Sequence, residues 1–385
     1  MRVTHLCLAC FFPDGFSYQE NMLPKFHAQQ GHDVCVIASL QTFDENGRVT
    51  FMPKAVSYQN EYDIPVTRLD YRRPVRLYRK MKRFAGTYAA LCEAAPEVLF
   101  IHGCQFLDVD QVIRYLREHP SVKVFVDNHA DFSNSARSWI SEKLLHGVIW
   151  KRCAHRLDPY VKKWYGVLPA RVDFLKNIYR LPEEKVELLV MGADDDKVRH
   201  ALAPEVRTDI RARYGIGPED FLIMTGGKID MAKQQTILLM EAVNRVPRAN
   251  VKLIVFGSVV PELKQAVEKN CSDRVQYIGW IQSDDAYDYF AAADLVVFPG
   301  RHSVFWEQVA GLGTPMLCKH WDGTTHVDAG GNVRFLRQDS ADEMCEIISA
   351  VTQDPELYQS MKAAAEAGMR MFSYDDIARR CLRPE

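Results

Sequence analysis

The sequence predicts an α/β protein made of two doubly wound halves, each a parallel sheet with helices on both faces. Three observations support this fold class. Short apolar, mostly β-branched runs alternate with segments of helical periodicity along nearly the whole chain. The strand candidates are almost continuously apolar, as expected of strands buried on both faces. The length of 385 residues exceeds what one core of ordinary size accommodates, so we expect two Rossmann-like domains.

Ten segments have the pattern of buried strands, five in each half of the chain. They are residues 3–10, 33–39, 98–103, 123–128 and 186–191 in the first half, and 221–226, 251–257, 275–279, 295–299 and 315–319 in the second. Helices are expected between them, with clear periodicity at 234–246 and 284–293.

We place the domains at residues 1–192 and 193–385, with the join near 189–198. Whether the last helix packs back on the N-terminal domain is left open. Ligands of such sheets bind beyond the carboxyl ends of the strands, which in a tandem pair predicts a site between the two domains.

The composition is that of a soluble globular protein, with 47% hydrophobic and 25% charged residues and a net charge of −2. No window has the roughly 18 apolar residues of a membrane span. The apolar segment 3–10 is interpreted as a first strand rather than a signal peptide. The ten cysteines are scattered, and Cys7 and Cys10 lie within this strand, so we expect reduced thiols in a cytoplasmic protein.

Positive charge is concentrated in the first half of the chain. Residues 1–192 contain 26 Lys and Arg against 21 Asp and Glu, whereas residues 193–385 contain 22 against 29. Residues 71–86, "YRRPVRLYRKMKRFAG", hold seven basic residues and no acid. After Pro74 a helix is expected with one apolar face, formed by Leu77, Met81, Phe84, Tyr88 and Leu91. This basic amphipathic helix either contacts an anionic membrane surface or a phosphorylated acceptor, or is a core helix with a solvated outer face.

The segment "FPGRHSVFWEQVAGLGTP" (298–315) contains a single acid, Glu307, among apolar and small residues. We expect Ser303 to cap a helix that begins at Val304. Glu307 is one residue too late for a capping box and points away from the core seam of that helix, which is Phe305, Val309 and Leu312. With nothing bulky over it, Glu307 is either an ordinary solvated side chain or a carboxylate that reaches a ligand's hydroxyls.

The segment "FLIMTGGKIDMAK" (221–233) runs from a strand through two glycines to two lysines before a helix. Gly226 and Gly227 let backbone come close to a ligand, while Lys228, Lys233 and the helix start supply positive potential. This arrangement suits a diphosphate. It matches neither the Walker A motif nor the three-glycine dinucleotide fingerprint, and an ordinary strand-to-helix turn is the alternative.

The order of six segments resembles the bacterial glycosyltransferase family 4 group, which has the GT-B fold. They are "PDGFSYQENMLPKFHAQQGHDVCVIAS", "VFVDNHADF", "VELLVMGADDDKV", "TGGKIDMAK", "VQYIGWIQSDDAYDYFAAADLVVFPG" and "EQVAGLGTP". The likeness covers nearly the full length and is strongest in residues 221–318.

The resemblance implies roles for residues of both halves. Gly15 matches the glycine-containing first loop near the donor phosphates and the acceptor. His129 matches a histidine beside the donor sugar, although a strand-end histidine satisfied by its neighbours is the alternative. Lys228, beside Gly227, matches a basic residue and Lys233 a lysine, both of which bind the diphosphate.

The same resemblance places the nucleoside in the second half. The segment "IGWIQ" (278–282), with Trp280 and Ile281, matches the loop that holds the nucleobase. Glu307 matches the second acid of a paired-glutamate motif, which accepts hydrogen bonds from the ribose hydroxyls. The first acid of that pair would fall on Pro299, and His302 and Ser303 occupy its space instead. The family's later glycine-rich loop is also altered, to "HWDGTTHVDAGGN" (320–332).

The resemblance implies a retaining, metal-independent transferase that moves a sugar from a nucleotide diphosphate sugar to a lipid-linked or cell-surface polysaccharide acceptor. It needs no cofactor and no nucleic acid, and would work in the cytoplasm or at the inner face of the membrane. The Asp194 and Asp196 pair is interpreted as an acidic turn rather than a metal site, and His102 is given no role. A nucleotide-sugar epimerase and a non-catalytic partner subunit are the alternatives.

Overall fold

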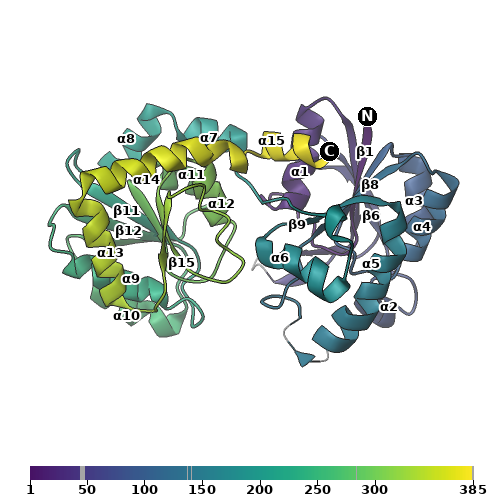
Figure 1. Cartoon of the computed structure of the whole chain (residues 1–385), viewed down its shortest axis with the longest axis horizontal. Coiled ribbons are helices and arrows are strands. Elements are labelled where there is room, and N and C mark those ends of the chain that lie inside the picture. Colours follow the sequence, from purple (N-terminus) through teal and green to yellow (C-terminus); the bar gives the residue numbers. More distant parts are fainter. Residues whose placement is uncertain (44–47, 137, 140, 283, 384–385) are drawn as a thin grey trace. The chain divides into compact units, whose positions relative to one another are not determined.

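The computed structural model describes residues 1–43, 48–136, 138–139, 141–282 and 284–383. The chain forms two compact units, drawn in Figure 1. The N-terminal unit comprises Met1–Met191 together with Tyr374–Glu385, and the C-terminal unit comprises Gly192–Ser373. The N-terminal unit is therefore built from two separate stretches of the chain.

Within the described residues, the sheet of the N-terminal unit has eight strands in the order β10-β9-β8-β7-β1-β2-β6-β5. All neighbours are parallel except β5, which is antiparallel to β6. The strands are β1 (Arg2–Cys7), β2 (Asp33–Ser39), β5 (Val56–Gln59), β6 (Pro65–Leu69), β7 (Val98–His102), β8 (Lys123–Asn128), β9 (Val161–Gly166) and β10 (Val186–Leu188); β3 (Gln41–Phe43) and β4 (Val49–Phe51) form a separate antiparallel pair.

The helices of the N-terminal unit cover both faces of this sheet. They are α1 (Gln19–Gln29), α2 (Val75–Met81), α3 (Thr87–Ala94), α4 (Val109–Glu118), α5 (Lys151–Leu157), α6 (Pro169–Phe174) and α15 (Tyr374–Cys381), with π-helical turns at Ser141–Trp150 and Leu175–Tyr179 and 3-10 turns at Asp158–Tyr160 and Glu183–Lys185. Successive residues of β7, Leu99, Phe100 and Ile101, are each 0% exposed. Because neighbouring side chains of a strand point to opposite faces, both faces are buried.

The sheet of the C-terminal unit has six parallel strands within the described residues, in the order β13-β12-β11-β14-β15-β16. They are β11 (Phe221–Gly226), β12 (Val251–Phe256), β13 (Val275–Gly279), β14 (Leu295–Phe298), β15 (Met316–Lys319) and β16 (Val333–Leu336). The helices are α7 (Asp195–Ala201), α8 (Pro204–Arg213), α9 (Gln235–Arg245), α10 (Lys264–Asn270), α11 (Ala286–Ala292), α12 (Phe305–Gly311), α13 (Ala341–Gln353) and α14 (Pro355–Gly368), with 3-10 turns at Pro261–Leu263 and Met369–Phe372.

The predicted fold class is confirmed, because each unit is a mostly parallel sheet between helices. Each of the ten predicted segments overlaps a strand. The first strand, β1, ends at Cys7, so the expectation that Cys10 lies within it is wrong. In the part of the chain that the structure describes, six strands were not predicted: β3, β4, β5, β6, β9 and β16.

The single helix expected after Pro74 is wrong. The chain forms α2, which ends at Lys82 in a left-handed conformation (φ +48°), and then α3, which starts after Gly86 (φ +93°). The interruption arises because Phe84 is buried and its backbone N–H donates to Asp108 Oδ2 at 2.9 Å. The two helices therefore do not share one apolar face, and Leu77 on α2 is 54% exposed.

The acidic turn at 194–196 caps a helix. Asp194 is the N-cap of α7, and its Oδ1 accepts a hydrogen bond from the backbone N–H of Asp196 at 3.1 Å. This contact gives the turn a structural role.

Candidate functional site

In the C-terminal unit a pocket opens at the carboxyl edge of the sheet, between the loops that follow β11 and β14. These strands are neighbours in the sheet, although β12 and β13 lie between them in the sequence. The winding of the sheet thus reverses between them, which is where doubly wound sheets bind ligands. We call it the β11–β14 pocket, and it is lined by Thr225, Gly226, Gly227, Lys228, Ile229, Lys233, Thr236, Val255, Phe256, Phe298, Pro299, Gly300, Arg301 and Ser303.

Two glycines of the pocket and one beneath it are required by the local geometry. A Cβ on Gly226 would lie 2.1 Å from the Phe256 ring, and a Cβ on Gly257 would lie 1.9 Å from the carbonyl oxygen of Gly227. Gly227 itself has φ +127° and no described atom within 4 Å of where a Cβ would stand. The loops after β11 and β12 are therefore tightly packed against each other, while open space lies beside Gly227.

Three cationic side chains line this pocket: Lys228, Lys233 and Arg301. Burial is the largest influence on Lys233 and lowers its pKa; Asp230 opposes this shift, and the charges of Arg301 and Lys228 add to it. The charges of Lys228 and Arg301 therefore act on Lys233, in addition to the larger effect of its burial. An anion in the pocket would offset these positive charges, so the geometry favours a phosphate-bearing ligand.

Arg301 was not predicted as a site residue. It follows the Pro299–Gly300 turn at the end of β14, and its position opposite Lys233 depends on β14 lying beside β11 in the sheet. The position of Arg301 in the sequence could have indicated a site residue. The first residues after a strand at the reversal point lie at the edge of the sheet where ligands bind.

Glu307 lies on α12 and is part of a buried cluster with two histidines. Its Oε1 lies 2.8 Å from His302 Nε2 and 2.7 Å from His326 Nε2. The Glu307 side chain is 0% exposed, and those of His302 and His326 are 13% and 2% exposed. Burial by itself raises the pKa of Glu307, but His302 and His326 more than offset this effect and lower it to about 2. Glu307 is therefore a buried carboxylate held by two imidazole N–H donors.

The expectation that nothing covers Glu307 is wrong, because the side chain is fully enclosed. His326 belongs to the loop after β15, and its approach to Glu307 could not be read from the local helical pattern. The Glu307 Oε2 atom is buried without a hydrogen-bond partner among the described residues. This oxygen is thus the acceptor of Glu307 that no described side chain uses.

The predicted cap at Ser303 is also wrong. Helix α12 begins at Phe305, its N-cap is Val304, and no side chain bonds to this helix end. Ser303 contributes its carbonyl oxygen, which accepts from Trp306 N–H at 3.0 Å, and it lines the β11–β14 pocket.

Trp280 and Ile281 lie on the loop after β13 and do not line the β11–β14 pocket. The Trp280 side chain is 69% exposed. Gly257 N–H donates to the carbonyl oxygen of Gly279 at 2.7 Å, which ties this loop to the one after β12. The exposed indole thus lies on the same edge of the sheet as the pocket.

The two predicted residues of the N-terminal unit lie on loops after β1 and β8. Gly15 has φ +76°, and its N–H donates to Glu61 Oε1 at 2.8 Å. His129 follows β8, is 26% exposed, and has its Nε2 3.3 Å from Asp127 Oδ2 and 3.9 Å from Glu20 Oε1. Burial lowers the pKa of His129, but Glu20 and Asp127 outweigh it and raise the value. His129 therefore faces two carboxylates.

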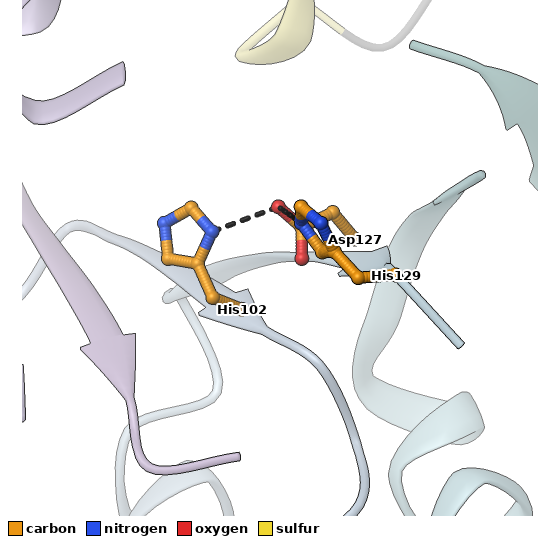
Figure 2. Close-up of side chains that lie close together, drawn as sticks. All are labelled: His102, Asp127 and His129. Carbon is orange, nitrogen blue, oxygen red and sulfur yellow. Dashed lines mark hydrogen bonds and ion pairs between the residues drawn. The ribbon is translucent and has the colours of Figure 1, made fainter. Parts of the chain in front are cut away.

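His102, which the sequence left without a role, lies at the centre of a buried network. Its Nδ1 is 2.8 Å from Asp127 Oδ2, the carboxylate that also faces His129 (Figure 2). Its Nε2 is 3.0 Å from His5 Nδ1, and His5 Nε2 is 3.0 Å from His27 Nδ1. His102 and Asp127 are register partners on β7 and β8, which places their side chains on the same face.

Two groups of described side chains bring histidine and carboxylate donor atoms within 4.8 Å: His102, Asp127 and His129, and His302, Glu307 and His326. A histidine that binds a metal through one ring nitrogen normally donates a hydrogen bond with the other. His326 Nδ1 is buried with no partner among the described residues, and His102 uses both nitrogens in hydrogen bonds. We therefore assign a metal to neither group.

The comparisons with known proteins agree with this architecture. Residues 220–354, within the C-terminal unit, match the family model described as glycosyl transferases group 1. The chain carries a group 1 glycosyltransferase domain. The predicted resemblance is confirmed at that level, and the predicted enzyme class, glycosyltransferase, is confirmed as the class of the family. The finer assignment to family 4 stays a prediction.

Curated relatives are similar over part of their length. Mannosylfructose-phosphate synthase of Agrobacterium fabrum is 26% identical over 149 residues, which are 36% of this chain and 32% of that protein. D-inositol 3-phosphate glycosyltransferase of Streptomyces griseus is 27% identical over 201 residues, which are 48% and 42% of the two chains. The matched part thus spans less than half the length of these relatives.

Solved structures are similar over the whole chain. Anabaena HepE in complex with UDP has a TM-score of 0.68 at 16% identity and is aligned over 99% of this chain and 98% of that one. UDP-GlcNAc 2-epimerase from Neisseria meningitidis has a TM-score of 0.64 at 12% identity, with 99% and 98% aligned. The predicted GT-B fold is confirmed. No helix among the described residues is long and apolar enough to cross a membrane.

Proposed function

We propose that this protein is a glycosyltransferase that moves a sugar from a nucleotide diphosphate sugar to a saccharide acceptor. The observation that carries the proposal is the convergence of Lys228, Lys233 and Arg301 around the Gly226–Gly227 turn at the reversal point of the C-terminal sheet. A diphosphate matches this pocket in charge, and the glycines allow its close approach to backbone N–H groups.

The chemistry needs only stabilisation of the leaving group. As the bond from sugar to diphosphate breaks, negative charge accumulates on the departing oxygen. Lys228, Lys233 and Arg301 then bind the transition state more strongly than the ground state. The reaction retains configuration when the acceptor attacks from the face that the diphosphate leaves, with the leaving phosphate taking the acceptor proton. In this scheme no carboxylate nucleophile and no metal ion takes part.

The remaining predicted residues complete the donor site. The exposed indole of Trp280 and the backbone at Ile281 receive the nucleobase, and Gly15 and His129 act on the sugar and acceptor side from the N-terminal unit. For the ribose contact we propose Glu307 Oε2, which would have to be uncovered by a movement of the side chains around it, and His302, which is the most exposed member of the cluster. A 2′-deoxyribose donor distinguishes these roles, because it should bind native protein more weakly yet lose little further in a Glu307→Gln variant.

The test of the pocket uses UDP, the nucleotide bound by HepE, in isothermal titration calorimetry. Lys233→Ala should weaken UDP binding by about 10-fold to 100-fold, since a charge-assisted hydrogen bond contributes roughly 1.5–3 kcal/mol. Lys264→Ala, on exposed α10, is the matched control and should bind as the native protein does. Equal affinities for all three proteins would exclude the β11–β14 pocket as the diphosphate site.

Turnover separates the alternatives. Nucleotide diphosphate sugars that raise the melting temperature are incubated with and without saccharide acceptors, in the presence of EDTA. Acceptor-dependent release of the nucleotide that EDTA does not diminish is the expected result. Conversion of the donor without an acceptor would identify an epimerase, and binding without turnover would identify a partner subunit.

For the acceptor we propose a lipid-linked or cell-surface polysaccharide precursor at an anionic membrane surface. The support is α2, on which Arg76 and Lys80 lie exposed next to two exposed apolar side chains, Val75 (41%) and Leu77 (54%). Cationic and apolar side chains on one exposed helix are typical of a segment that lies on anionic lipid.

The membrane proposal is tested by sedimentation with vesicles of mixed anionic and neutral phospholipid. Arg76→Glu together with Lys80→Glu should abolish binding, and binding of the native protein should fall as salt is raised. Reversal of Lys264 and Lys269, exposed on α10, is the matched control. A native protein that ignores the vesicles at low salt would show that α2 is a solvated surface.

A further inference from the structure

The core of the N-terminal unit contains a continuous chain of hydrogen bonds through three fully buried histidines. His5 on β1, His27 on α1 and His102 on β7 are each 0% exposed. The chain runs from the carbonyl oxygen of Ala378, on α15, through His27, His5 and His102 to Asp127 on β8.

Four hydrogen bonds make up this chain, and each has an ordinary length. Ala378 O lies 2.9 Å from His27 Nε2. The two contacts between imidazoles, His27 to His5 and His5 to His102, are both 3.0 Å. His102 Nδ1 lies 2.8 Å from Asp127 Oδ2. All six ring nitrogens are therefore used.

The two ends of the chain fix how many protons it needs. A backbone carbonyl is only an acceptor, and so is an ionised carboxylate. Four hydrogen bonds require four protons, but three neutral imidazoles carry only three N–H groups. The fourth proton must reside either on one imidazole, which becomes a cation, or on the carboxyl group of Asp127.

The surroundings of Asp127 decide between these two sites. Its Oδ2 contacts His102 Nδ1 and lies 3.3 Å from His129 Nε2 (Figure 2). The same oxygen also accepts a hydrogen bond from Gln19 Nε2 at 3.3 Å. Two hydrogen-bond donors, from His102 and Gln19, thus converge on this one oxygen, and the His129 imidazole adds an ion-pair contact. Such an environment stabilises a carboxylate.

We propose that the His27–His5–His102 chain holds one proton more than three neutral imidazoles, and that this buried cation keeps Asp127 ionised as the partner of His129. The extra proton, and with it the positive charge, is located on His102, next to the carboxylate. His102 and Asp127 are then positioning residues, which act on the proposed reaction through His129. This last step rests on the proposed function, whereas the proton count does not.

The titratable groups around the chain agree with this assignment. Burial lowers the pKa of His102, but Asp127, with smaller contributions from Cys7 and Glu20, raises it to about 9. Burial lowers the pKa of His27 to about 3, with His32 and His102 adding to the shift and Ala378 O opposing it. His5 is likewise lowered by burial and by its two histidine neighbours. Cys381 Sγ lies 3.6 Å from His27 Nε2, and burial raises the pKa of this thiol, so it stays uncharged.

The function of such a chain follows from its charge. A lone buried carboxylate would take up a proton and lose its hold on His129. With the cation inside the sheet, Asp127 stays charged at neutral pH, and His129 keeps a fixed orientation at the end of β8. An imidazole held in this way presents its other nitrogen to whatever binds at that edge of the sheet.

The test is nitrogen NMR of the native protein labelled in histidine, which distinguishes neutral imidazoles from imidazolium. Among the assigned signals of His5, His27 and His102, one should remain imidazolium at neutral pH and lose its proton only near pH 9, while the other two stay neutral. Neutral imidazoles at all three of these positions would overturn the proposal. Infrared spectroscopy of the same sample offers a second measurement without any variant, because a protonated buried carboxyl band that disappears in Asp127→Asn would contradict an ionised Asp127.

Asp127→Asn tests the chain by substitution. The asparagine amide can donate to His102 Nδ1, so four hydrogen bonds persist with three neutral imidazoles and the excess proton is no longer needed. The imidazolium signal should disappear, and persistence of the signal would overturn the proposal. Asp131→Asn is the matched control, because Asp131 is paired with Arg171 at 3.0 Å and lies outside the chain. If Asp127→Asn does not fold, the native spectra still decide.

The positioning role has a separate readout. In a turnover assay Asp127→Asn should lower kcat, with little change in the affinity of the C-terminal unit for UDP. If the native protein does not bind UDP, this would count against the proposed function. It would not affect the inference that the histidine chain holds an extra proton. An unchanged kcat in Asp127→Asn would exclude the positioning role.

Discussion

The effect of Glu307 on stability depends on its surroundings in the fold. As a solvated glutamate it would matter little for folding. Enclosed with His302 and His326, it is a buried charge whose removal leaves two imidazole N–H groups without a full partner. We therefore expect the Glu307 carboxylate to contribute to the stability of the fold.

Glu307→Gln should lower the free energy of unfolding at neutral pH by on the order of 3 kcal/mol, because the native pKa is lowered from 4.5 to about 2. A carboxyl group with a lowered pKa stabilises the fold above pH 4.5, and this stabilisation is lost as the pH falls through about 2. Urea unfolding at neutral and acidic pH measures both effects. Glu268→Gln, exposed on α10, is the control, and equal stability of the two variants would contradict the prediction.

The histidine chain predicts stability limits on both sides of neutrality. His102 has a native pKa raised from 6.5 to about 9, so its stabilising effect is complete below pH 6.5 and is lost as the pH rises through about 9. His27 has a native pKa lowered to about 3, so its effect is present above pH 6.5 and is lost as the pH falls through about 3.

Melting temperatures across this range should therefore be highest near pH 6.5 for the part of the transition that belongs to the N-terminal unit. Asp127→Asn should flatten the alkaline side and leave the acidic side, since it removes the need for the extra proton. An alkaline side of equal slope in the native protein and the variant would contradict this expectation.

At the scale of elements, the shape of the β11–β14 pocket depends on a contact between two loops rather than on its lining alone. Gly257, after β12, supports the turn at Gly227 from below, and Gly257 N–H donates to Gly279 O in the loop after β13. Three consecutive loops at the carboxyl edge are thus linked, which holds the Gly226–Gly227 turn in place.

Gly257→Ala should consequently weaken UDP binding about 10-fold or more, although residue 257 does not line the pocket. The new methyl group would have to displace the carbonyl of Gly227, at a cost of roughly 1–3 kcal/mol for the strained backbone alone. Gly215→Ala also has a positive φ (+67°) but meets no described atom within 4 Å. It should destabilise the protein without changing calorimetric affinity for UDP, and a similar loss of affinity in both variants would show a general effect.

Element prediction from sequence succeeded where hydrophobicity alone specifies the element. The apolar runs at 98–103 and 221–226 lie at the centres of their sheets and could hardly be anything but buried strands. Strand β9, "VKKWYG", contains two lysines, and β6 begins with a proline, so neither has the pattern of a central strand. The break between α2 and α3 depends on Asp108, 24 residues beyond Phe84, and no local pattern records it.

The residues of the candidate site were likewise predictable only where they lie close together in the sequence. Gly227, Lys228 and Lys233 lie within one short segment, and the motif placed them together. Arg301, His326 and the histidine chain are joined to their partners only through the sheet order, so long-range packing, which a single sequence does not encode visibly, determined them.

At the scale of the whole molecule, the N-terminal unit includes a segment from the far end of the chain. Tyr374, Ile377, Ala378 and Cys381 of α15 are each 1% exposed or less. Gln30 Nε2 donates to the carbonyl oxygen of Asp375 at 2.7 Å, and Tyr165 OH donates to that of Cys381 at 3.1 Å. The helix is thus an integral part of the N-terminal core.

Deleting the residues after Ser373 should selectively destabilise the N-terminal unit, because it removes these apolar side chains and the acceptor at the end of the histidine chain. Scanning calorimetry should show an earlier transition for the N-terminal unit, with calorimetric UDP affinity retained by the C-terminal unit. A variant that melts as the full chain does would show that α15 is dispensable.

The position of α15 also has a consequence for biosynthesis. During translation the first 191 residues emerge from the ribosome before the rest, but their core still lacks a helix and a hydrogen-bond acceptor for His27. The C-terminal unit is contiguous in sequence, so it can fold while the N-terminal unit is still incomplete. The unit made first is therefore the one finished last, and the apolar surface that α15 covers stays exposed until residues 374–381 have been made.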